Sequence, residues 1–230
     1  MASTKNNLEV LFEDNHLIVV NKKSGDIVQG DKTGDKPLSD IVKEYIKEKY
    51  HKPGNVFLGV VHRLDRPTTG VIVFARTSKA LERFNKMLRD KKVTKTYWAV
   101  VKNKPKKDED TLIGFLRKNP KNNKSTSYSS EIEGSKKAIL HYKTIKSLDN
   151  YHLLEVDLET GRHHQIRCQL SSIGSSVKGD LKYGFDRSNK DASIHLHARK
   201  ITFIHPVTKE DITIIAPTPN EVIWNACIQP

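Results

Sequence analysis

Short runs of apolar, β-branched residues recur along the whole chain, and turn-forming residues separate them. Such runs are typical of β-strands, and most of them follow one another with no helical pattern between them. This order favours one α+β domain over a regular series of β-α-β units. The strand candidates are Val10–Phe12, Leu17–Val20, Val60–Leu64, Val71–Phe74, Lys95–Val101, Leu112–Leu116, Ala138–Ile145, Tyr151–Leu158, Leu196–Phe203 and Ile212–Ala216.

Three helix candidates interrupt the strands, and each has apolar residues spaced along one face. The first begins at Pro37, Thr77 or Ser78 caps the second, and the third ends at Gly174, where a left-handed residue fits. No repeat and no Pro- or Ser-rich linker divides the chain. We therefore expect a single domain over residues 1–230, with residues 1–7 as a flexible tail.

The 230-residue chain is strongly basic, with 40 Lys and Arg against 27 Asp and Glu and a net charge of +13. Such an excess favours a phosphate-rich polymer or an anionic surface as partner. Residues 91–146 hold most of it, with 15 cationic against 5 acidic side chains. Within them, residues 118–130 have the composition of an exposed loop or mobile hairpin tip. Contact with a polyanion and simple solvation both remain open for this segment.

Cysteine content and the N-terminus indicate the compartment. Two cysteines, Cys168 and Cys227, exclude a disulfide scaffold and suit a reducing environment. The first residues are polar with no signal peptide pattern, and no run of about 18 apolar residues exists to span a membrane. We expect a cytoplasmic protein.

Residues 62–70 (HRLDRPTTG) are the most informative stretch, because an acid lies between two arginines and apolar runs flank the segment. Positive charge on Arg63 and Arg66 keeps the neighbouring carboxylate of Asp65 ionised, which suits a nucleophile or a fixed base. The competing interpretation is a turn aspartate that caps its own backbone, the commoner fate of a lone aspartate.

Residues 160–167 (TGRHHQIR) lead from a predicted strand into a helix. Polar groups at a helix N-terminus favour an anion, and Arg162 and Arg167 are placed to face a phosphate or a carboxylate. On a helix, Arg167 shares a face with His163 and points inward. A strand turn with solvated arginines is the alternative.

Two further patterns have a chemical and a bland interpretation. Lys95 and Tyr97 share one face of a predicted strand, so Tyr97 either stacks on a base or is half-buried core. His195 and His197 also share a strand face, yet no acid or cysteine at short range completes a metal site. No phosphate-binding glycine loop and no Ser or Cys nucleophile motif is present. We expect neither a metal nor a cofactor.

Residues 62–65 (HRLD) with 68–70 (TTG) resemble the active-site signature HRLDxxTSG of the RluA-type pseudouridine synthases. The likeness continues in the family's order, at residues 12–23, 95–101, 160–167, 179–184 (GDLKYG), 196–198, 205–206 and 216–217. It implies a single α+β domain around a long, bent, mostly antiparallel β-sheet with flanking helices. It also implies isomerisation of a uridine in ribosomal or transfer RNA to pseudouridine, with no cofactor.

The resemblance assigns roles by position. Asp65 corresponds to the essential aspartate, which attacks the nucleotide or abstracts a proton. Tyr97 corresponds to the tyrosine that stacks on the target base and assists the final proton removal, and Arg167 to the arginine that pairs with the catalytic carboxylate. Arg63 corresponds to a residue inserted into the RNA as the target base flips out. The remaining residues expected to bind substrate are His62, Lys95, Arg162, His164 and Gln165.

The chain departs from the family pattern at three places. Thr69 replaces serine, His163 replaces threonine, and Cys168-Gln169 replaces the common Val-His. The last two are expected to affect which RNA is accepted. Only about seven residues precede the first predicted strand, so we expect no S4-type RNA-binding module, and RNA contact from the catalytic domain itself. Structured RNA is the expected partner of a monomer with no obligate protein partner and no membrane association.

Two other classes of function stay open at this point. One is a catalytically silent RNA-binding module on the same fold, which the presence of Asp65, Tyr97 and Arg167 disfavours. The other is a metal hydrolase that uses His195 and His197.

Overall fold

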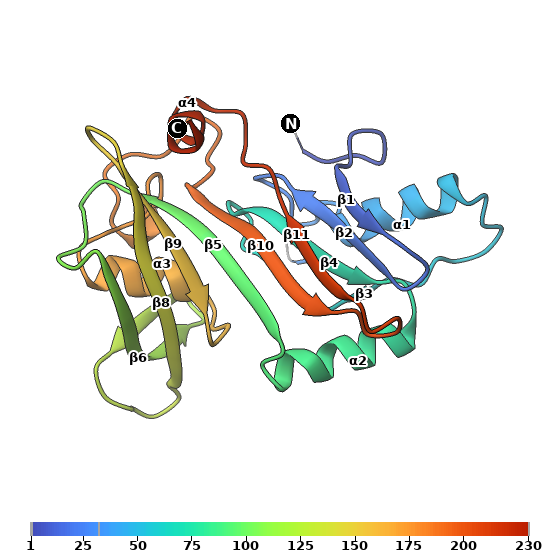
Figure 1. The fold of residues 1–230 in the computed structure, drawn as a ribbon, viewed down its shortest axis with the longest axis horizontal. Coiled ribbons are helices and arrows are strands. Elements are labelled where there is room, and N and C mark those ends of the chain that lie inside the picture. The colour runs from blue at the N-terminus through green and yellow to red at the C-terminus, as the bar shows by residue number, and fades with distance from the viewer. Residues whose placement is uncertain (1, 32, 230) are drawn as a thin grey trace. The chain divides into compact units, whose positions relative to one another are not determined.

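The computed structural model describes residues 2–31 and 33–229, and Figure 1 shows their arrangement as a ribbon. The strands are β1 (Val10–Glu13), β2 (Leu17–Lys22), β3 (Gly59–Val60), β4 (Thr69–Ala75), β5 (Val93–Val101), β6 (Glu109–Asn119), β7 (Lys124–Tyr128), β8 (Lys136–Ser147), β9 (His152–Leu158), β10 (Leu196–Ile204) and β11 (Asp211–Ile215). The helices are α1 (Leu38–Lys49), α2 (Ser78–Arg89), α3 (Gln165–Ser172), α4 (Val222–Ile228) and the one-turn 3-10 helix η1 (Leu181–Tyr183).

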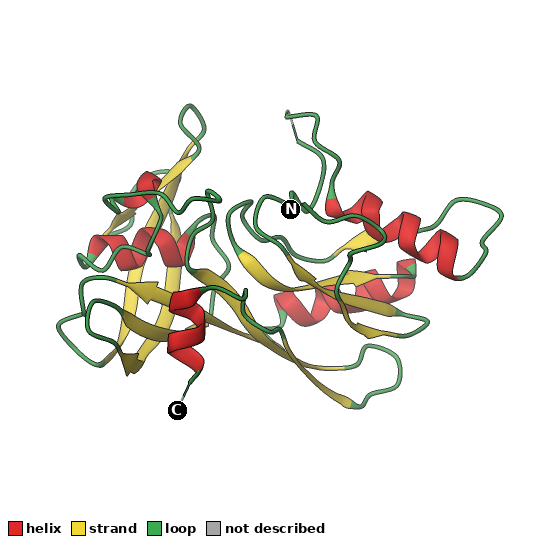
Figure 2. Cartoon of the chain, turned by 90° about the horizontal axis from the view of Figure 1, so that it is seen from above, coloured by secondary structure: helices red, strands yellow, loops and turns green. Residues whose placement is uncertain are grey.

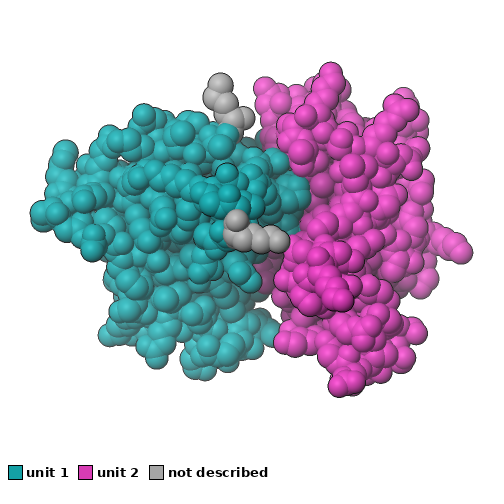
Figure 3. All heavy atoms as spheres, turned by 180° about the vertical axis from the view of Figure 1, so that it is seen from behind, with its two compact units in different colours: residues 1–94, 198–218 teal, residues 95–197, 219–230 magenta. Residues whose placement is uncertain are grey.

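The chain forms two compact units, coloured teal and magenta in Figure 3. Unit 1 contains residues 1–94 and 198–218, and unit 2 contains residues 95–197 and 219–230. That residues 1–230 act as one domain stays a prediction.

Unit 1 is a sheet with the helices α1 and α2 packed beside it (Figure 2). Its strand order is β1-β2-β4-β10, with β11 paired to β10 and β3 to β4. The central strands β2 and β4 are antiparallel and almost completely buried. Leu38, Val42 and Ile46 of α1 pack on the apolar side chains of β2 and β4. Phe84 of α2 contacts Phe203 of β10 with ring centroids 5.0 Å apart.

Unit 2 contains an antiparallel sheet in the order β5-β9-β8-β6-β7. Buried and exposed residues alternate along β8, as expected when one face of a sheet packs and the other is solvated. On the packed face, Leu116 and Ala138 form a cluster with Cys168 of α3 and Tyr183 of η1. Trp224 of α4 packs in a separate cluster.

The α+β class with a mostly antiparallel sheet and flanking helices is therefore confirmed. One predicted boundary is wrong. The strand expected at Val60–Leu64 is only β3 (Gly59–Val60), because residues 61–68 leave the ladder to form a loop. Of the two interpretations of residues 118–130, the hairpin tip is the one that the structure bears out, because β7 pairs with β6 around a turn at residues 120–123.

The N-terminal segment is anchored to unit 1 rather than free at every residue. Ser3 is buried, and its backbone N–H and its hydroxyl donate to the carboxylate of Asp26 over 2.9 and 2.6 Å. That residues 1–7 form a flexible tail stays a prediction, and Met1 lies outside the described residues. Within the described ranges, no helix has the length and apolar character needed to cross a membrane.

Candidate active site

Unit 1 presents Asp65 on the loop that connects β3 to β4. The side chain of Asp65 is half-buried, and Arg63 and Arg66 on either side of it are exposed. Leu64 packs against the core formed by β2, β4 and α1, which anchors the loop from beneath. Arg66 forms an ion pair with Asp35 over 2.7 Å. The packing of Leu64 thus fixes the loop, and the loop presents the carboxylate of Asp65 near the surface.

The start of β4 requires glycine at position 70. Gly70 has a φ of +112°, and a Cβ there would lie 2.3 Å from the carbonyl oxygen of Ala198 in β10. Only a residue without a side chain allows this approach and this backbone conformation. The glycine that closes the HRLDRPTTG segment therefore fixes where the loop enters the sheet.

A buried lysine holds the backbone of the same loop. The side chain of Lys22, at the end of β2, is only 1% exposed. Its ammonium donates hydrogen bonds to the carbonyl oxygens of Lys23 (3.0 Å), Arg66 (3.0 Å) and Thr68 (2.8 Å). Burial lowers the pKa of Lys22 to about 8, against the opposing effect of the carboxylates of Asp26 and Asp65. Sequence reasoning missed Lys22 as a site residue, because its only signal is a lysine two positions after the apolar run Leu17–Val20.

The side chain of His62, in the loop between β3 and β4, is hydrogen-bonded to the sheet. Its Nε2 accepts a hydrogen bond from the backbone N–H of Val73 in β4 over 3.0 Å. A ring nitrogen that accepts carries no proton, so this contact fixes the tautomer of the imidazole. The predicted substrate contact of His62 stays a prediction.

Lys95 and Tyr97 lie on β5 in unit 2. Tyr97 is 8% exposed, so its ring belongs to the packed face. Burial lowers the pKa of Lys95. The Lys95 ammonium lies 3.6 Å from where a Cβ at Gly161 would be, which brings it to the TGR turn. Stacking of Tyr97 on a base stays a prediction.

Gln165 organises the turn that precedes α3. Its Oε1 accepts from the hydroxyl of Thr160 (2.8 Å) and the backbone N–H of Arg162 (3.0 Å), and its Nε2 donates to the carbonyl of Ile139 (3.0 Å). Arg162 is exposed, and its Nε donates to the carbonyl of Lys137 over 2.8 Å. The contacts of Gln165 support a role in shaping the turn, and direct contact of either residue with RNA stays a prediction.

Two stacked histidines directly precede α3. The rings of His163 and His164 are 3.7 Å apart between centroids and inclined by 23°. His164 has a left-handed backbone with a φ of 53°, and its Nδ1 lies 2.9 Å from the hydroxyl of Tyr183. Burial and the nearby charge of Arg167 lower the pKa of His164 to about 2. The imidazole is therefore neutral at any working pH.

Arg167 points into the core of unit 2, as its helical spacing predicts. It is 4% exposed and forms a two-point ion pair with Asp180, with Nε to Oδ2 at 2.6 Å and Nη2 to Oδ1 at 2.8 Å. The alternative of solvated arginines is wrong for Arg167 and holds for Arg162. Asp65 belongs to unit 1 and Arg167 to unit 2, so their pairing stays a prediction.

The histidine pair that suggests a metal has other partners. His195 Nε2 lies 2.9 Å from Glu221 and its Nδ1 lies 3.0 Å from Asn189 Nδ2, while the ring stacks on Trp224. Among the residues that the structure describes, no group of three or more His, Cys, Asp or Glu side chains is arranged to hold a metal ion.

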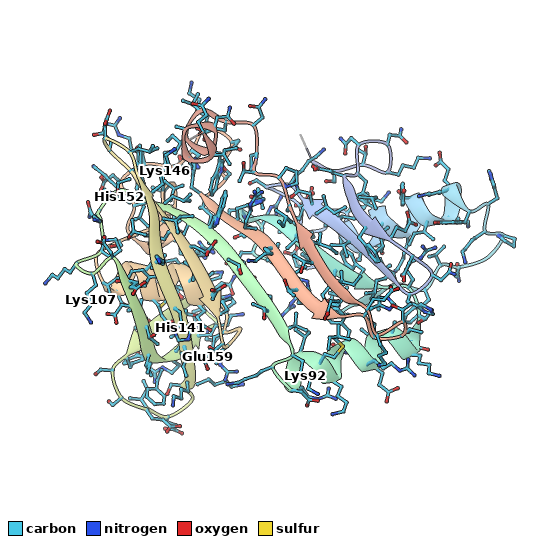
Figure 4. All side chains as sticks on the ribbon, in the orientation of Figure 1. Lys92, Lys107, His141, Lys146, His152 and Glu159 are labelled. Carbon is cyan, nitrogen blue, oxygen red and sulfur yellow. The ribbon has the colours of Figure 1, made fainter. Side chains whose placement is uncertain are left out.

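The basic segment divides into neutralised and unpaired cations. Lys107 forms an ion pair with Asp110 (Figure 4). In the described part of the chain, by contrast, several cations at or near the β6–β7 hairpin have no acidic partner within 4.0 Å. They are Arg117, Lys118, Lys121, Lys124, Lys136, Lys137 and Lys182.

The solved structures that this chain resembles define its fold class. The human RNA pseudouridylate synthase domain containing 4 protein superposes with a TM-score of 0.79, at 22% identity over 95% of this chain and 92% of that one. The human domain containing 1 protein gives a TM-score of 0.74 at 21% identity, over 99% of this chain and 90% of that one. At these identities, the likeness establishes the pseudouridine synthase fold.

The family follows from the sequence matches. Residues 16–172 match the model of the RNA pseudouridylate synthase family. A Synechocystis sp. protein named as an uncharacterized RNA pseudouridine synthase is 33% identical, over 92% of this chain and 66% of its own length. The ribosomal large subunit pseudouridine synthase D of Zymomonas mobilis is 33% identical, over 94% and 70%. The tRNA pseudouridine synthase C of Vibrio parahaemolyticus is 27% identical, over 91% and 89%. The chain belongs to the RNA pseudouridylate synthase family, with the RluA-type signature at residues 62–70.

Proposed function

We propose that this protein isomerises a specific uridine in ribosomal or transfer RNA to pseudouridine, with Asp65 as the essential catalytic residue. The observation that carries the proposal is the loop around Asp65. Its backbone carbonyls are bound by the buried ammonium of Lys22, and its apolar residue Leu64 packs in the core. A reactive side chain on a rigid support is what a positioned catalyst requires.

The reaction is a rearrangement that needs no redox step. The N1–C1′ bond of the uridine breaks, the base rotates, and a C5–C1′ bond forms. One proton leaves C5 and one is taken up at N1, so the product has the atoms of the substrate. Asp65 either attacks the nucleotide or abstracts a proton, and an ionised carboxylate serves both roles.

The other roles belong to residues in both units. Arg167 pairs with the Asp65 carboxylate and keeps it ionised, and Tyr97 stacks on the target base and assists the final proton removal. Exposed Arg63 enters the RNA as the base flips out, the general device for chemistry on a stacked base. His62, Lys95, Arg162, His164 and Gln165 support the RNA-bound loops and the flipped nucleotide.

The RNA is structured ribosomal or transfer RNA. Relatives of this chain are named for each substrate, namely a large subunit enzyme and a tRNA enzyme. The unpaired cations of unit 2 supply the phosphate contacts that bind RNA without reading its sequence. We propose that the protein acts in the cytoplasm as a monomer, without an obligate protein partner, and light scattering of the purified protein checks its mass.

The test is the appearance of pseudouridine in bulk cellular RNA. The wild type is expected to produce it, and Asp65→Ala and Asp65→Asn are expected to produce none. Because phosphate contacts supply most of the binding, RNA affinity of Asp65→Asn is expected to stay within about tenfold of wild type. Wild-type protein that binds RNA yet never modifies it is instead a silent RNA-binding module. Mapping pseudouridines in RNA from a deletion strain against its parent then identifies the site.

A further inference from the structure

The segment from Gly179 to Gly184 (GDLKYG) has no role in the function proposed above, yet it contacts two of the candidate site residues. We propose that Asp180 is a positioning residue that holds the guanidinium of Arg167 in its catalytic orientation, with Tyr183 supporting the other side. This inference rests on the proposed function, because it concerns how Arg167 serves Asp65.

Asp180 holds Arg167 by two parallel hydrogen bonds. Its oxygens accept from Nε and Nη2 of Arg167 over 2.6 and 2.8 Å, and the side chains of both residues are almost fully buried, at 1% and 5% exposure. A two-point contact between a carboxylate and a guanidinium fixes the plane of the arginine as well as its distance. Rotation about the terminal bonds of Arg167 would break at least one of these hydrogen bonds.

The segment that carries Asp180 is itself fixed to β5, the strand that carries Tyr97. The backbone N–H of Lys178 donates to the carbonyl of Val100 over 2.8 Å, and Val177 bridges to Val101. Tyr183 and Phe185 then close the turn by donating their N–H groups to the Asp180 carbonyl over 3.1 and 3.0 Å. Asp180 therefore sets the position of Arg167 relative to the strand that holds the proposed base-stacking tyrosine.

Tyr183 fixes Arg167 from a second direction. Its ring centroid lies 5.0 Å from Cζ of Arg167, within the range of a cation–π contact. Its hydroxyl accepts from the backbone N–H of Ser125 over 2.8 Å and lies at hydrogen-bond distance, 2.9 Å, from Nδ1 of His164. Burial raises the pKa of Tyr183 to about 12, so the hydroxyl stays protonated at neutral pH. One ring therefore orders both Arg167 and His164.

A purely structural ion pair would also be buried, so the test must separate positioning from stability. The variant is Asp180→Asn, which keeps the shape but loses the charge and one acceptor. The matched control is Glu13→Gln in unit 1, because Glu13 and Arg76 form another buried ion pair, each 8% exposed and 3.0 Å apart. Both variants are assayed in multiple turnover over a range of RNA concentrations, so that kcat and KM are measured separately, at a temperature where circular dichroism shows them folded.

The expected result for Asp180→Asn is a loss of kcat of about 30- to 100-fold, because small misplacements of catalytic groups cost rates of this order. RNA Kd and KM are expected to stay within about threefold, since Arg167 is buried away from the phosphate contacts. Glu13→Gln is expected to lower the melting temperature but to keep kcat within about threefold of wild type. Equal losses of kcat in both variants, or no loss in Asp180→Asn, would overturn the inference.

A double-mutant cycle tests whether Asp180 acts through Arg167. In an Arg167→Lys background, Asp180→Asn is expected to cost less than about threefold, because the interaction that it removes is already broken. A full additional loss would show that Asp180 has an independent role and would contradict the proposal. Failure of wild-type protein to form pseudouridine would instead contradict the proposed function, whereas an active wild type with a fully active Asp180→Asn contradicts the inference alone.

Discussion

The ammonium of Lys22 donates a hydrogen bond of 2.8 Å to the backbone carbonyl of Thr68, three residues after Asp65. The same ammonium binds the carbonyl of Arg66, so one buried charge holds two backbone carbonyls of the loop that carries Asp65. Without Lys22, these backbone carbonyls would form hydrogen bonds with water, and the loop would be less ordered. Lys22 replaces that water with a fixed donor and so makes the loop part of the sheet.

Replacement of Lys22 by methionine is expected to reduce both stability and turnover. The variant removes the Lys22 donor from three carbonyl oxygens, of which the Arg66 carbonyl keeps the backbone N–H of Gly25 (3.0 Å) and the Thr68 carbonyl is buried. We therefore expect the free energy of unfolding to fall by about 2–4 kcal/mol. Urea denaturation measures this loss, and single-turnover assays measure the slower reaction of a less ordered loop.

Lys23→Met is the matched control, because its ammonium is bonded to one carbonyl only, that of Asn7 over 3.1 Å. We expect it to change stability by less than about 0.5 kcal/mol. Equal destabilisation by the two substitutions would show that the buried position of Lys22 has no special role.

The stability of the protein should also depend on the protonation of Lys22. The pKa of this group is about 8 in the fold, below the ordinary value of 10.5, because burial disfavours its charged form. Between about pH 8 and 10.5 the unfolded chain therefore holds a proton that the folded chain has lost. Stability contributed by this group rises with pH across that window and is flat below it.

The measurement is the difference in unfolding free energy between wild type and Lys22→Met at several pH values, since the other lysines cancel. The difference is expected to grow from pH 8 to 10.5. A flat difference would mean that Lys22 titrates normally despite its burial.

Gly70→Ala is expected to be strongly destabilising. A Cβ at this position meets the Ala198 carbonyl at 2.3 Å on a backbone with a φ of +112°. Steric overlap with the backbone and left-handed strain together are expected to cost about 3 kcal/mol or more. Gly30→Ala serves as control because nothing lies within 4 Å of its Cβ position, and it should change stability by about 1 kcal/mol at most. Thermal denaturation of both variants provides the comparison.

Sequence alone predicts the central strands because their apolar runs are a local property. The β8 prediction, Ala138–Ile145, falls inside the observed Lys136–Ser147 for this reason. By contrast, β7 reads KSTSY and carries little apolar signal, so its strand state depends on pairing with β6. Only the fold can reveal such a partner.

The candidate site shows the same division. The signature residues around Asp65 are contiguous and can be recognised as a motif. Two of the three carbonyls that bind Lys22 lie 44 and 46 positions away along the chain, and Asp180 lies 13 positions beyond Arg167. No local sequence pattern indicates that these groups are in contact, so the supporting contacts of the site can be found only in the structure.

RNA affinity should fall steeply with added salt, and the unpaired cations should determine the slope. Each lysine that contacts a phosphate releases a counterion, so removing one reduces the slope of log affinity against log salt by about 1. Lys118 has no acidic partner within 4.0 Å among the described residues, whereas Lys107 lies 3.0 Å from Asp110. We therefore expect Lys118→Ala to weaken binding and flatten the slope, and Lys107→Ala to change neither by a measurable amount.

Fluorescence anisotropy with labelled RNA between 50 and 200 mM salt, roughly the range over which phosphate contacts lose their strength, measures both the affinity and the slope. A wild-type affinity that does not respond to salt would remove the electrostatic argument for RNA binding, and equal effects of the two substitutions would show that ion pairing in the free protein does not decide which lysines bind RNA.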